Sequence, residues 1–358
     1  MRAGNQLVAV RGGQTVTRRE LLRVALGTGA VLAGGGMLAA CAQPTPVLQG
    51  VATLPPPETT TVRIGAPFPC DPGLMLAGDF LSEEGFTEVR YVAANILERA
   101  WVLNRDADVA LGHSEWIVAS LDAGVPLVTL AGLHSGCYEL WAGARIQSIG
   151  ELRGKKIAVR RIDTSDVFYA FFATLLGYVG IDPIKDVQFI AAGTGLEMNN
   201  AFIEGRADAV LAGGSQGPTF RRLSKAPGHV LLATMTDKPW SQYLCCNLVA
   251  NSDWARQNPI ATKRVTRALL RATDRAAKDP ARAAHDAVAA GGFDDESLVR
   301  ETTDMCTYNW RELDPEETIR FFALRLADAK LITSTPQQLI AQGTNLAYMR
   351  QLRTELTQ

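Results

Sequence analysis

The sequence predicts an α/β protein of two lobes, each with a mostly parallel β-sheet flanked by helices. From Thr61 onward, short apolar runs alternate with helical stretches, and the alternation starts again after Leu152. Such alternation is typical of parallel sheets with helices on both faces. After Cys246 the sequence changes to long amphipathic helices. Two similar halves followed by a helical tail indicate two lobes with a cleft between them.

The first half, residues 61–148, is expected to form most of the first lobe. Its strands are expected at Thr61–Gly65, Val89–Val92, Asp108–Leu111, Leu127–Ala131 and Tyr138–Trp141. Its helices are expected over Gly73–Glu84 and Ile96–Asn104. Ligands of open α/β sheets bind outside the carboxyl ends of the strands, so the loops that follow these strands are candidate site elements.

The second half, residues 149–245, is expected to form the second lobe. Its strands are expected at Ile157–Val159, Val187–Ala191, Ala207–Leu211 and Val230–Thr234. Helices are expected over Ser165–Tyr178 and Leu196–Glu204, and Gly180 and Pro183 follow the first of them as helix-stop signals.

The last part, residues 246–358, is expected to return to the first lobe and to end in helices. These helices are expected over Pro259–Lys278, Pro280–Ala290, Pro315–Ala329 and from Pro336 onward. The two crossovers between the lobes are expected near Gly143–Leu152 and Tyr243–Val249.

Residues 1–40 have the features of an export signal rather than of the fold. The twin arginine Arg18-Arg19 is typical of the route that exports folded proteins. An uncharged stretch from Val24 to Ala40 follows and ends in Leu38-Ala39-Ala40-Cys41, which resembles a lipobox. We therefore expect lipid attachment at Cys41, with an ordinary cleaved signal peptide or an uncleaved anchor as alternatives. Residues 41–60, rich in Pro and Thr, are expected to form a flexible tether.

Charge and cysteine content exclude several classes of protein. Without the leader the chain has 31 Lys and Arg against 36 Asp and Glu, and no basic block indicates nucleic-acid binding. Five cysteines remain after Cys41, at positions 70, 137, 245, 246 and 306. Their odd number and the lack of a CxxC spacing indicate neither a disulfide framework nor a zinc site. The sequence therefore predicts no metal and no cofactor.

Three segments resemble the nitrate/sulfonate/taurine-binding family. They are Leu152–Val159 (LRGKKIAV), Gly205–Ala209 (GRADA) and Asp108–Ala110 (DVA), and the resemblance covers roughly residues 61–290. It implies a periplasmic-binding-protein fold (type II), whose two hinged lobes close on a small solute. It also implies a monomer that works with the permease subunits of an ABC transporter.

The first lobe offers polar residues after three of its strands. No nucleophile elbow or metal-ligand spacing accompanies them, so solute contact is expected rather than catalysis, and no catalytic residue is predicted. For Phe68–Asp71 the alternative is a proline-containing turn with a buried cysteine. For His134 and Ser135 it is a turn that only joins two strands. The candidates are Phe68, Cys70, Asp71, His113, Ser114, Glu115, His134 and Ser135.

The second lobe offers a helix start, a glycine loop and two aromatic residues. Thr164 or Ser165 is expected to cap the helix at Ser165, where free N–H groups suit an anion, although Asp163 and Asp166 disfavour one. Trp240 and Tyr243 either stack on a solute or pack the hinge. The candidates are Thr164, Ser165, Asp166, Gly213, Gly214, Ser215, Trp240 and Tyr243.

These observations predict an exported, lipid-anchored solute-binding protein of an ABC importer that is not an enzyme. The solute is expected to be small, polar or heteroaromatic, and without strong negative charge. Two alternatives remain. The first is an enzyme similar to the fungal thiamine-pyrimidine synthases, whose CCCFC motif lies near an iron and is only partly matched by Cys245-Cys246. The second is a lipoprotein that senses a solute and signals to a membrane partner.

Overall fold

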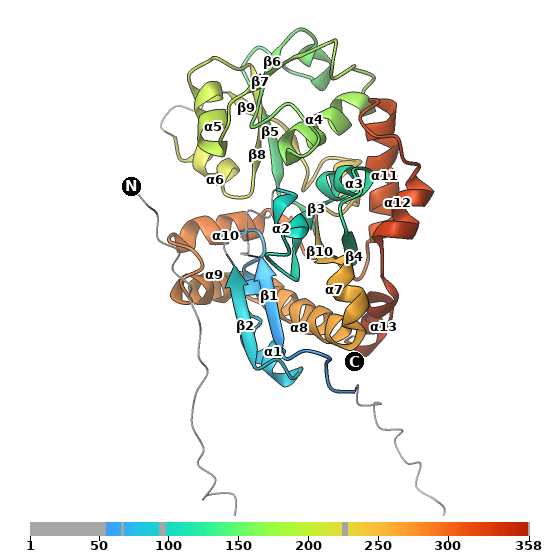
Figure 1. Ribbon diagram of the computed structural model, residues 1–358. Helices are drawn as coiled ribbons and strands as arrows, with labels where there is room; N and C mark the ends of the chain where they lie inside the picture. The colour runs from blue at the N-terminus through green and yellow to red at the C-terminus, as the bar shows by residue number, and fades with distance from the viewer. Residues whose placement is uncertain (1–54, 66–67, 93–97, 224–227, 357–358) are drawn as a thin grey trace, which may run out of the picture.

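The computed structural model describes residues 55–65, 68–92, 98–223 and 228–356. Two β-sheets with helices packed on their faces form two lobes, one above the other in Figure 1. The first sheet has the strand order β11-β4-β10-β3-β1-β2 and the second the order β7-β6-β8-β5-β9. The predicted two-lobe α/β class is thus confirmed. The leader, Cys41 and most of the predicted tether lie outside the described residues.

The first sheet mixes parallel and antiparallel strands. β1 pairs in parallel with β2 and β3, whereas β10 runs antiparallel to β3 and β4. The prediction of a mostly parallel sheet is therefore wrong in this detail, because β10 enters the sheet from the opposite lobe. The strands are β1 (Thr61–Gly65), β2 (Glu88–Val92), β3 (Val109–His113), β4 (Leu127–Gly136), β10 (Cys246–Asn251) and β11 (Cys306–Thr307).

The second sheet is mixed for the same reason. β6 pairs in parallel with β7 and β8, whereas β5, which arrives directly from β4 of the first lobe, runs antiparallel to β8 and β9. The strands are β5 (Tyr138–Ala142), β6 (Lys156–Val159), β7 (Gln188–Ala191), β8 (Ala209–Gly213) and β9 (His229–Ala233).

The helices cover both sheets and the side of the molecule where the lobes meet. α11 packs against α3 of the first lobe and α4 of the second, and α3 and α4 also pack against each other. The 3-10 helices are Pro72–Leu76, Ile149–Leu152 and Trp240–Gln242. The α-helices are α1 (Gly78–Glu83), α2 (Ala100–Leu103), α3 (Ser114–Asp122), α4 (Val167–Tyr178), α5 (Gly195–Ile203), α6 (Gln216–Arg221), α7 (Ser252–Gln257), α8 (Pro259–Lys278), α9 (Pro280–Ala289), α10 (Glu296–Asp304), α11 (Pro315–Asp328), α12 (Pro336–Gly343) and α13 (Ala347–Glu355).

Two short crossovers join the lobes. The first is Cys137, between the end of β4 and the start of β5, and the second precedes β10 at Leu244-Cys245. The second crossover was predicted in this region. The first lies earlier than the predicted 143–152, because Tyr138–Ala142 pairs in the second sheet. The second lobe therefore begins at β5, eleven residues before the predicted boundary at 149.

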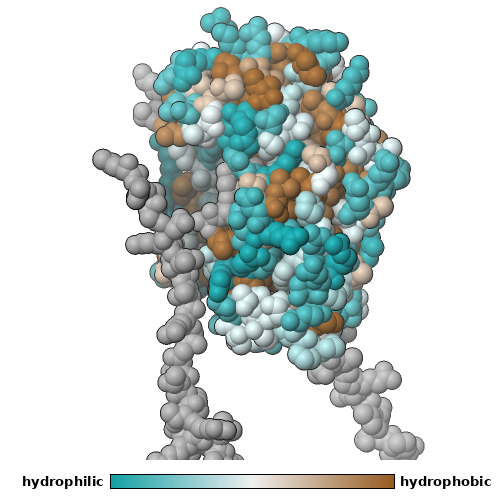
Figure 2. All heavy atoms as spheres, in the orientation of Figure 1, coloured by the Kyte–Doolittle hydropathy of each residue, from teal (hydrophilic) through white to brown (hydrophobic). Residues whose placement is uncertain are grey.

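The described surface carries several exposed apolar side chains. On the face shown in Figure 2, hydrophobic patches are separated by hydrophilic side chains. Exposed large apolar side chains, such as Leu103, Ile184 and Leu196, come from different elements. Within the described part of the chain, every helix is too short or too polar to cross a bilayer.

Candidate functional site

Seven cysteine and histidine side chains gather around the two crossovers between the lobes. Two groups within this set have donor atoms that all lie within 4.8 Å of one another: His113, Cys137, Cys245 and Cys246, and Cys70, His134 and Cys246. Each of these six side chains is buried, and the seventh, Cys306, is half-buried. We call the set of Cys70, His113, His134, Cys137, Cys245, Cys246 and Cys306 the thiol–histidine cluster.

Cys246 lies between two histidines in the first sheet. As the first residue of β10, it pairs with His113 of β3 on one side and with His134 of β4 on the other. Side chains of directly opposite residues share one face of a sheet, so these three are neighbours. The β3 end is fixed to the crossover by Ser114, whose N–H donates to the Cys245 carbonyl at 3.0 Å.

Cys137 is held on the first crossover in a backbone conformation that favours glycine. Its φ is 75°, which is rare for residues with a Cβ and is often found at functional sites. The preceding Gly136 has a φ of 94°, and a Cβ there would overlap the Met305 carbonyl oxygen. That same carbonyl accepts the Cys137 N–H at 3.3 Å. The segment before β11 therefore fixes the direction of the Cys137 side chain.

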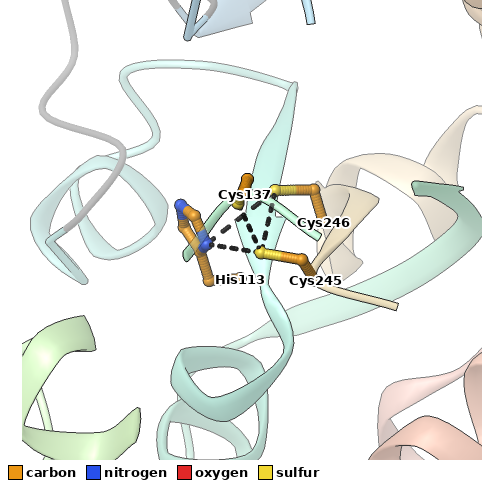
Figure 3. A group of neighbouring side chains, drawn as sticks. All are labelled: His113, Cys137, Cys245 and Cys246. Carbon is orange, nitrogen blue, oxygen red and sulfur yellow. Dashed lines mark hydrogen bonds between the residues drawn. The ribbon is translucent and has the colours of Figure 1, made fainter. Parts of the chain in front are cut away.

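The first group of donors converges on a common point. Figure 3 shows the sulfurs of Cys137, Cys245 and Cys246 pointing toward each other and toward His113 Nδ1. Cys245 Sγ and Cys246 Sγ lie 3.8 Å apart. His113 Nδ1 lies 3.6 Å from Cys245 Sγ and 3.8 Å from Cys246 Sγ. Cys137 Sγ is 2.7 Å from Cys245 Sγ, longer than a disulfide bond of about 2.05 Å.

The second group contains buried polar atoms that lack hydrogen bonds of ordinary geometry. His134 Nδ1 lies 3.4 Å from the Ser135 carbonyl oxygen, whereas its Nε2 has no such partner within the described residues. Both carboxylate oxygens of Asp71, the residue after Cys70, also lack a hydrogen-bond partner within the described residues. Buried polar groups are nearly always paired in folded proteins.

Burial and mutual contact shift the pKa values of the cluster strongly. Burial raises the pKa of Asp71 to about 7. Hydrogen bonds from Cys137, Cys246 and Cys306 hold the pKa of Cys70 well below its ordinary value. Burial lowers the pKa of His134, but the close approach and the charge of the Cys70 thiol outweigh it and raise that pKa to about 9.

Cys245 is the second thiol of the cluster with a depressed pKa. Burial opposes ionisation, but hydrogen bonds from Cys137, Cys246 and His113 hold its pKa well below the ordinary value. Burial raises the pKa of both Cys137 and Cys246. Thiolates beside imidazoles are the form of cysteine that binds metals or acts as a nucleophile.

Tyr138 links the two lobes beside this cluster. Its hydroxyl donates to Glu115 Oε1 at 2.9 Å and lies 2.8 Å from His113 Nδ1. Burial raises the pKa of Glu115 to about 8, and its Oε2 has no hydrogen-bond partner within the described residues. A cavity of about 10 Å³ lies here, roughly enough for one water molecule. It is lined by Glu115, Gly136, Tyr138, Phe171, Thr234, Trp240, Tyr243, Leu244, Cys245 and Phe322.

The other first-lobe candidates surround the cluster without forming a separate site. The Phe68 ring meets the His113 ring edge-on at 5.8 Å. Ser114 Oγ donates to the Leu244 carbonyl at 2.6 Å. Ser135 is paired with Asn309, since its N–H donates to Asn309 Oδ1 and its Oγ accepts from Asn309 Nδ2.

The helix start in the second lobe differs from the prediction. α4 begins at Val167, and Asp166 caps it by accepting the Tyr169 N–H at 3.0 Å, so the predicted cap at Thr164 or Ser165 is wrong. Asp166 also accepts from Arg160 Nε at 2.7 Å, and both side chains are buried.

Thr164 and Ser165 lie outside the cluster, at the edge of the contact between the lobes. Both are half-buried. The Thr164 carbonyl accepts from Arg99 Nη2 at 3.3 Å, and the Ser165 N–H donates to Asp163 Oδ1 at 2.7 Å. Their polar groups are therefore used in local contacts.

The glycine loop after β8 supports Tyr138. A Cβ at Gly213 would lie 2.8 Å from Tyr138 Cε1, so glycine there lets the ring approach. The Gly213 N–H donates to Gln216 Oε1 at 3.0 Å. Gly214 has a φ of 56°, and the Ser215 carbonyl accepts the Thr219 N–H at 3.1 Å in the first turn of α6.

Trp240 and Tyr243 pack where the lobes meet and also line the small cavity. The Tyr243 ring stacks on Phe321 of α11 at 4.0 Å with an interplanar angle of 15°. The Trp240 ring lies 5.3 Å from Phe171 of α4. Packing at the hinge, one of the two predicted roles, is seen here, and stacking on a solute stays a prediction.

A larger pocket, of about 170 Å³, lies away from the cluster and beside α7. Its charged side chains are paired with each other: Arg63 with Asp108 at 2.6 Å, and Arg105 with Asp253 at 2.8 Å. The convergent donors with perturbed pKa values lie instead at the crossovers, and these features mark functional sites better than volume does.

A protein-family model matches segments of both lobes. The model of NMT1/THI5-like proteins matches residues 79–283, which is more than half of the chain. The chain belongs to the NMT1/THI5-like family. The predicted resemblance is thereby confirmed, since this family model and the solved structures below agree with it. The comparison with curated proteins gave no match.

Solved structures similar to this NMT1/THI5-like protein share its fold at low sequence identity. The nitrate-binding protein NrtA of Synechocystis PCC 6803 is 14% identical, with a TM-score of 0.64 over 84% of this chain and 90% of that one. The alkanesulfonate-binding protein SsuA of Xanthomonas axonopodis pv. citri, bound to MOPS, is 15% identical, with a TM-score of 0.63 over 81% and 99%. A ligand-binding component of an ABC-type import system from Staphylococcus aureus, with zinc bound, is 16% identical, with a TM-score of 0.61 over 82% and 98%.

Sequence reasoning missed the main feature of this site. Cys137, Cys245, Cys246 and Cys306 were not among the candidates, and the absence of a metal was argued from the lack of CxxC spacing. The cluster escaped notice because separate elements supply its donors, and the absence of a metal stays a prediction. A usable signal was present: Cys70, His113 and His134 follow or end strands at one edge of the sheet. The start of an antiparallel strand, here Cys246, lies at that same edge.

Proposed function

We propose that this NMT1/THI5-like protein is an extracytoplasmic, lipid-anchored solute-binding protein that delivers a small organic solute to an ABC importer. The observation that carries the proposal is the family match across both lobes, residues 79–283. Proteins that share the fold include nitrate- and sulfonate-binding proteins. In this role the two lobes open at the crossovers, take up the solute and close on it.

Contacts between the lobes support this motion. The Tyr138 hydroxyl of the second lobe binds Glu115 of the first, and α11 packs on both α3 and α4. The cavity between these contacts, about 10 Å³, is far smaller than the roughly 300 Å³ typical of ligand pockets. The structure therefore corresponds to closed lobes, and an organic solute enters only after they separate.

The acidic groups at the closed interface disfavour a strongly anionic solute. Asp71 and Glu115 are buried on the first lobe, and burial raises their pKa values to about 7 and about 8. Their ionised forms repel an anion, and their protonated forms can donate a hydrogen bond to a polar solute. Arg160 compensates the charge of Asp166, so this residue does not repel an anion. We propose a small polar or heteroaromatic solute that hydrogen-bonds with Glu115 and Tyr138 and packs on Phe171.

We propose further that the protein binds without converting its solute. One observation favours the alternative of an enzyme, namely the depressed pKa of Cys245 beside His113. Mass spectrometry of a solute incubated with the protein separates the two. Recovery of the intact solute supports a binding protein, and stoichiometric or catalytic conversion would support an enzyme.

The binding role is tested by a thermal-shift screen of the full chain against small metabolites, followed by calorimetry of each compound that stabilises it. A ligand that binds only the folded state raises the melting temperature with its concentration. Tyr138→Phe removes one hydroxyl at the interface, and we expect about tenfold weaker binding of the solute. The control is Tyr91→Phe, whose hydroxyl donates to the Leu74 carbonyl within the first lobe at 2.9 Å.

Two results would contradict the proposal. One is tight binding of alkyl sulfonates or nitrate with no response to neutral or cationic heterocycles, which would show that the acidic groups do not set the class of solute. The other is an equal loss of affinity in Tyr138→Phe and Tyr91→Phe, because the solute would then not bind between the lobes.

A further inference from the structure

We propose that the thiol–histidine cluster binds one thiophilic metal ion, with Zn²⁺ as the ion that fits best. The ligands are the thiolates of Cys137, Cys245 and Cys246 and the imidazole of His113. The ion ties the two crossovers together at the hinge. This inference goes beyond solute binding and holds whichever organic solute the protein takes.

The donor set matches the chemistry of zinc. Three cysteine thiolates and one histidine form one of the common structural zinc sets, and soft sulfur ligands select Zn²⁺ and Cu⁺ over harder ions. All four side chains are buried, and their donor atoms lie within 4.8 Å of one another. A closed set of four protein ligands leaves no position for water, which agrees with the small cavity beside it.

The distances match a tetrahedral site at three of the observed edges. Zn–S bonds of about 2.3 Å and Zn–N bonds of about 2.05 Å give S···S edges of about 3.8 Å and S···N edges of about 3.6 Å. Cys245 Sγ and Cys246 Sγ are 3.8 Å apart. His113 Nδ1 lies 3.6 Å and 3.8 Å from them. The Cys137–Cys245 edge, at 2.7 Å, must widen by about 1 Å to enclose the ion.

If an ion binds His113 Nδ1, the Tyr138 hydroxyl beside this nitrogen still has a hydrogen-bond partner. The Tyr138 hydroxyl lies 2.8 Å from Nδ1, and it also donates to Glu115 Oε1 at 2.9 Å. When the ion takes Nδ1, the hydroxyl keeps its bond to Glu115. The histidine is thus free to act as a ligand without leaving a buried polar group unpaired.

The position of the ion in the fold would affect the motion of the two lobes. Cys137 is the first crossover, whereas Cys245 and Cys246 lie at the end of the second. His113 ends β3, the neighbour of β10 in the first sheet. One ion bound by these residues connects both chain segments that join the lobes, so it restricts the hinge of the solute-binding motion proposed above.

The predicted export route provides the conditions that such a site requires. Thiols stay reduced in the cytoplasm, whereas disulfides form readily outside it. A twin-arginine leader, as predicted at Arg18-Arg19, exports proteins already folded. The ion therefore binds before export and protects Cys137 and Cys245 from oxidation to a disulfide.

The test measures metal directly. The full chain is purified under reducing, oxygen-free conditions, treated with chelator, and titrated with Zn²⁺ and, separately, with Cu⁺. We expect about one Zn²⁺ per chain by elemental analysis, with proton release as the thiols ionise. Co²⁺ in the same site should give sulfur-to-cobalt charge-transfer absorption that falls by about a third in Cys246→Ser, because one of three thiolates is lost.

Single substitutions distinguish the residues that bind the ion from a neighbouring cysteine that does not. Cys137→Ser, Cys246→Ser and His113→Gln should each weaken Zn²⁺ binding by at least about 100-fold. Cys306→Ser is the matched control, since this cysteine belongs to the cluster but to neither donor group, and it should keep one equivalent. Circular dichroism and the unchanged melting temperature of the metal-free forms show that each variant is folded.

Several results would overturn the site. They are less than about a tenth of an equivalent of either metal in the reduced wild-type chain, an equal loss in Cys306→Ser and Cys246→Ser, or a Cys137–Cys245 disulfide that persists in the cytoplasmic protein. Stoichiometric Cu⁺ with no Zn²⁺ would overturn the assignment of the ion. None of these measurements uses an organic solute, so failure of the metal site and failure of the solute-binding role are distinguishable.

Discussion

Gly136 and Cys137 show what the first crossover demands of single residues. β4 ends and β5 begins within three residues, and the chain passes from one sheet to the other there. This sharp change of direction requires positive φ at both positions, 94° and 75°. Glycine adopts such angles at no cost, whereas a cysteine does so only where its surroundings compensate the strain.

Gly136→Ala should destabilise the protein by about 3 kcal/mol. A left-handed residue with a Cβ costs about 1 to 2 kcal/mol, and the overlap with the Met305 carbonyl adds about as much again. The control is Gly124→Ala, where φ is 74° and a Cβ would meet nothing within 4 Å. That change should cost only about 1 kcal/mol. Urea unfolding measures both, and equal losses would show that the Met305 segment relaxes around the new methyl group.

Single residues also decided how much of the site the sequence could predict. Cys70, His113 and His134 were placed near the cleft because each follows or ends an apolar run. Cys137 and Cys245 could not be placed from spacing, since these two cysteines contact each other although they are 108 positions apart in the chain. Only the pairing of β10 with β3 and β4 shows that Cys246 lies between two histidines.

At the scale of elements, the long helices with clear end signals were predicted well, whereas two buried elements, α3 and β10, were missed. α8 begins at Pro259 and ends at Lys278, as expected from its alternating faces and its proline at the first position. α3 was not predicted, because all residues from Ser114 to Leu121 are buried and no polar stripe marks the helix. β10 was taken for a crossover, since a buried apolar strand after two cysteines has no periodicity of its own.

Asp166→Ala should destabilise the second lobe by about 3 to 5 kcal/mol. The change removes the cap of α4 and leaves the buried Arg160 guanidinium without its carboxylate. The control is Thr194→Ala, which removes the exposed cap of α5 and should cost about 1 kcal/mol. Thermal unfolding compares the two variants. Equal effects would mean that Asp166 acts as a helix cap only and that its pairing with Arg160 contributes nothing.

At the scale of the whole molecule, the two crossovers bring the proposed hinge and the thiol–histidine cluster to the same place. Each lobe has its own sheet, and the described chain passes between them through Cys137 and through Leu244-Cys245. The same segments carry most of the convergent donors in Figure 3. The ion proposed above would restrict the proposed hinge, whereas an ion within one lobe would leave the hinge free.

The proposed lipid attachment involves Cys41, which lies outside the described residues. Within the described ranges every helix is too short or too polar to span a bilayer. The described chain starts at Pro55, whose carbonyl accepts from Arg264 on α8. Glu58 then accepts the N–H groups of Ile260 and Ala261, so this end of the predicted tether is held against the start of the helix.

Cys41→Ser should therefore release the protein from the membrane fraction or stall its processing. One acyl chain gives only marginal attachment, but the two chains of a diacylglycerol hold a protein stably. Serine has no thiol to accept them. Cell fractionation and the mass of the mature chain measure the effect, with Cys306→Ser as the control that should remain in the membrane fraction. Unchanged fractionation and an unchanged mature mass in Cys41→Ser would show that attachment does not depend on this cysteine. That result would favour the alternative in which Val24–Ala40 is an uncleaved anchor.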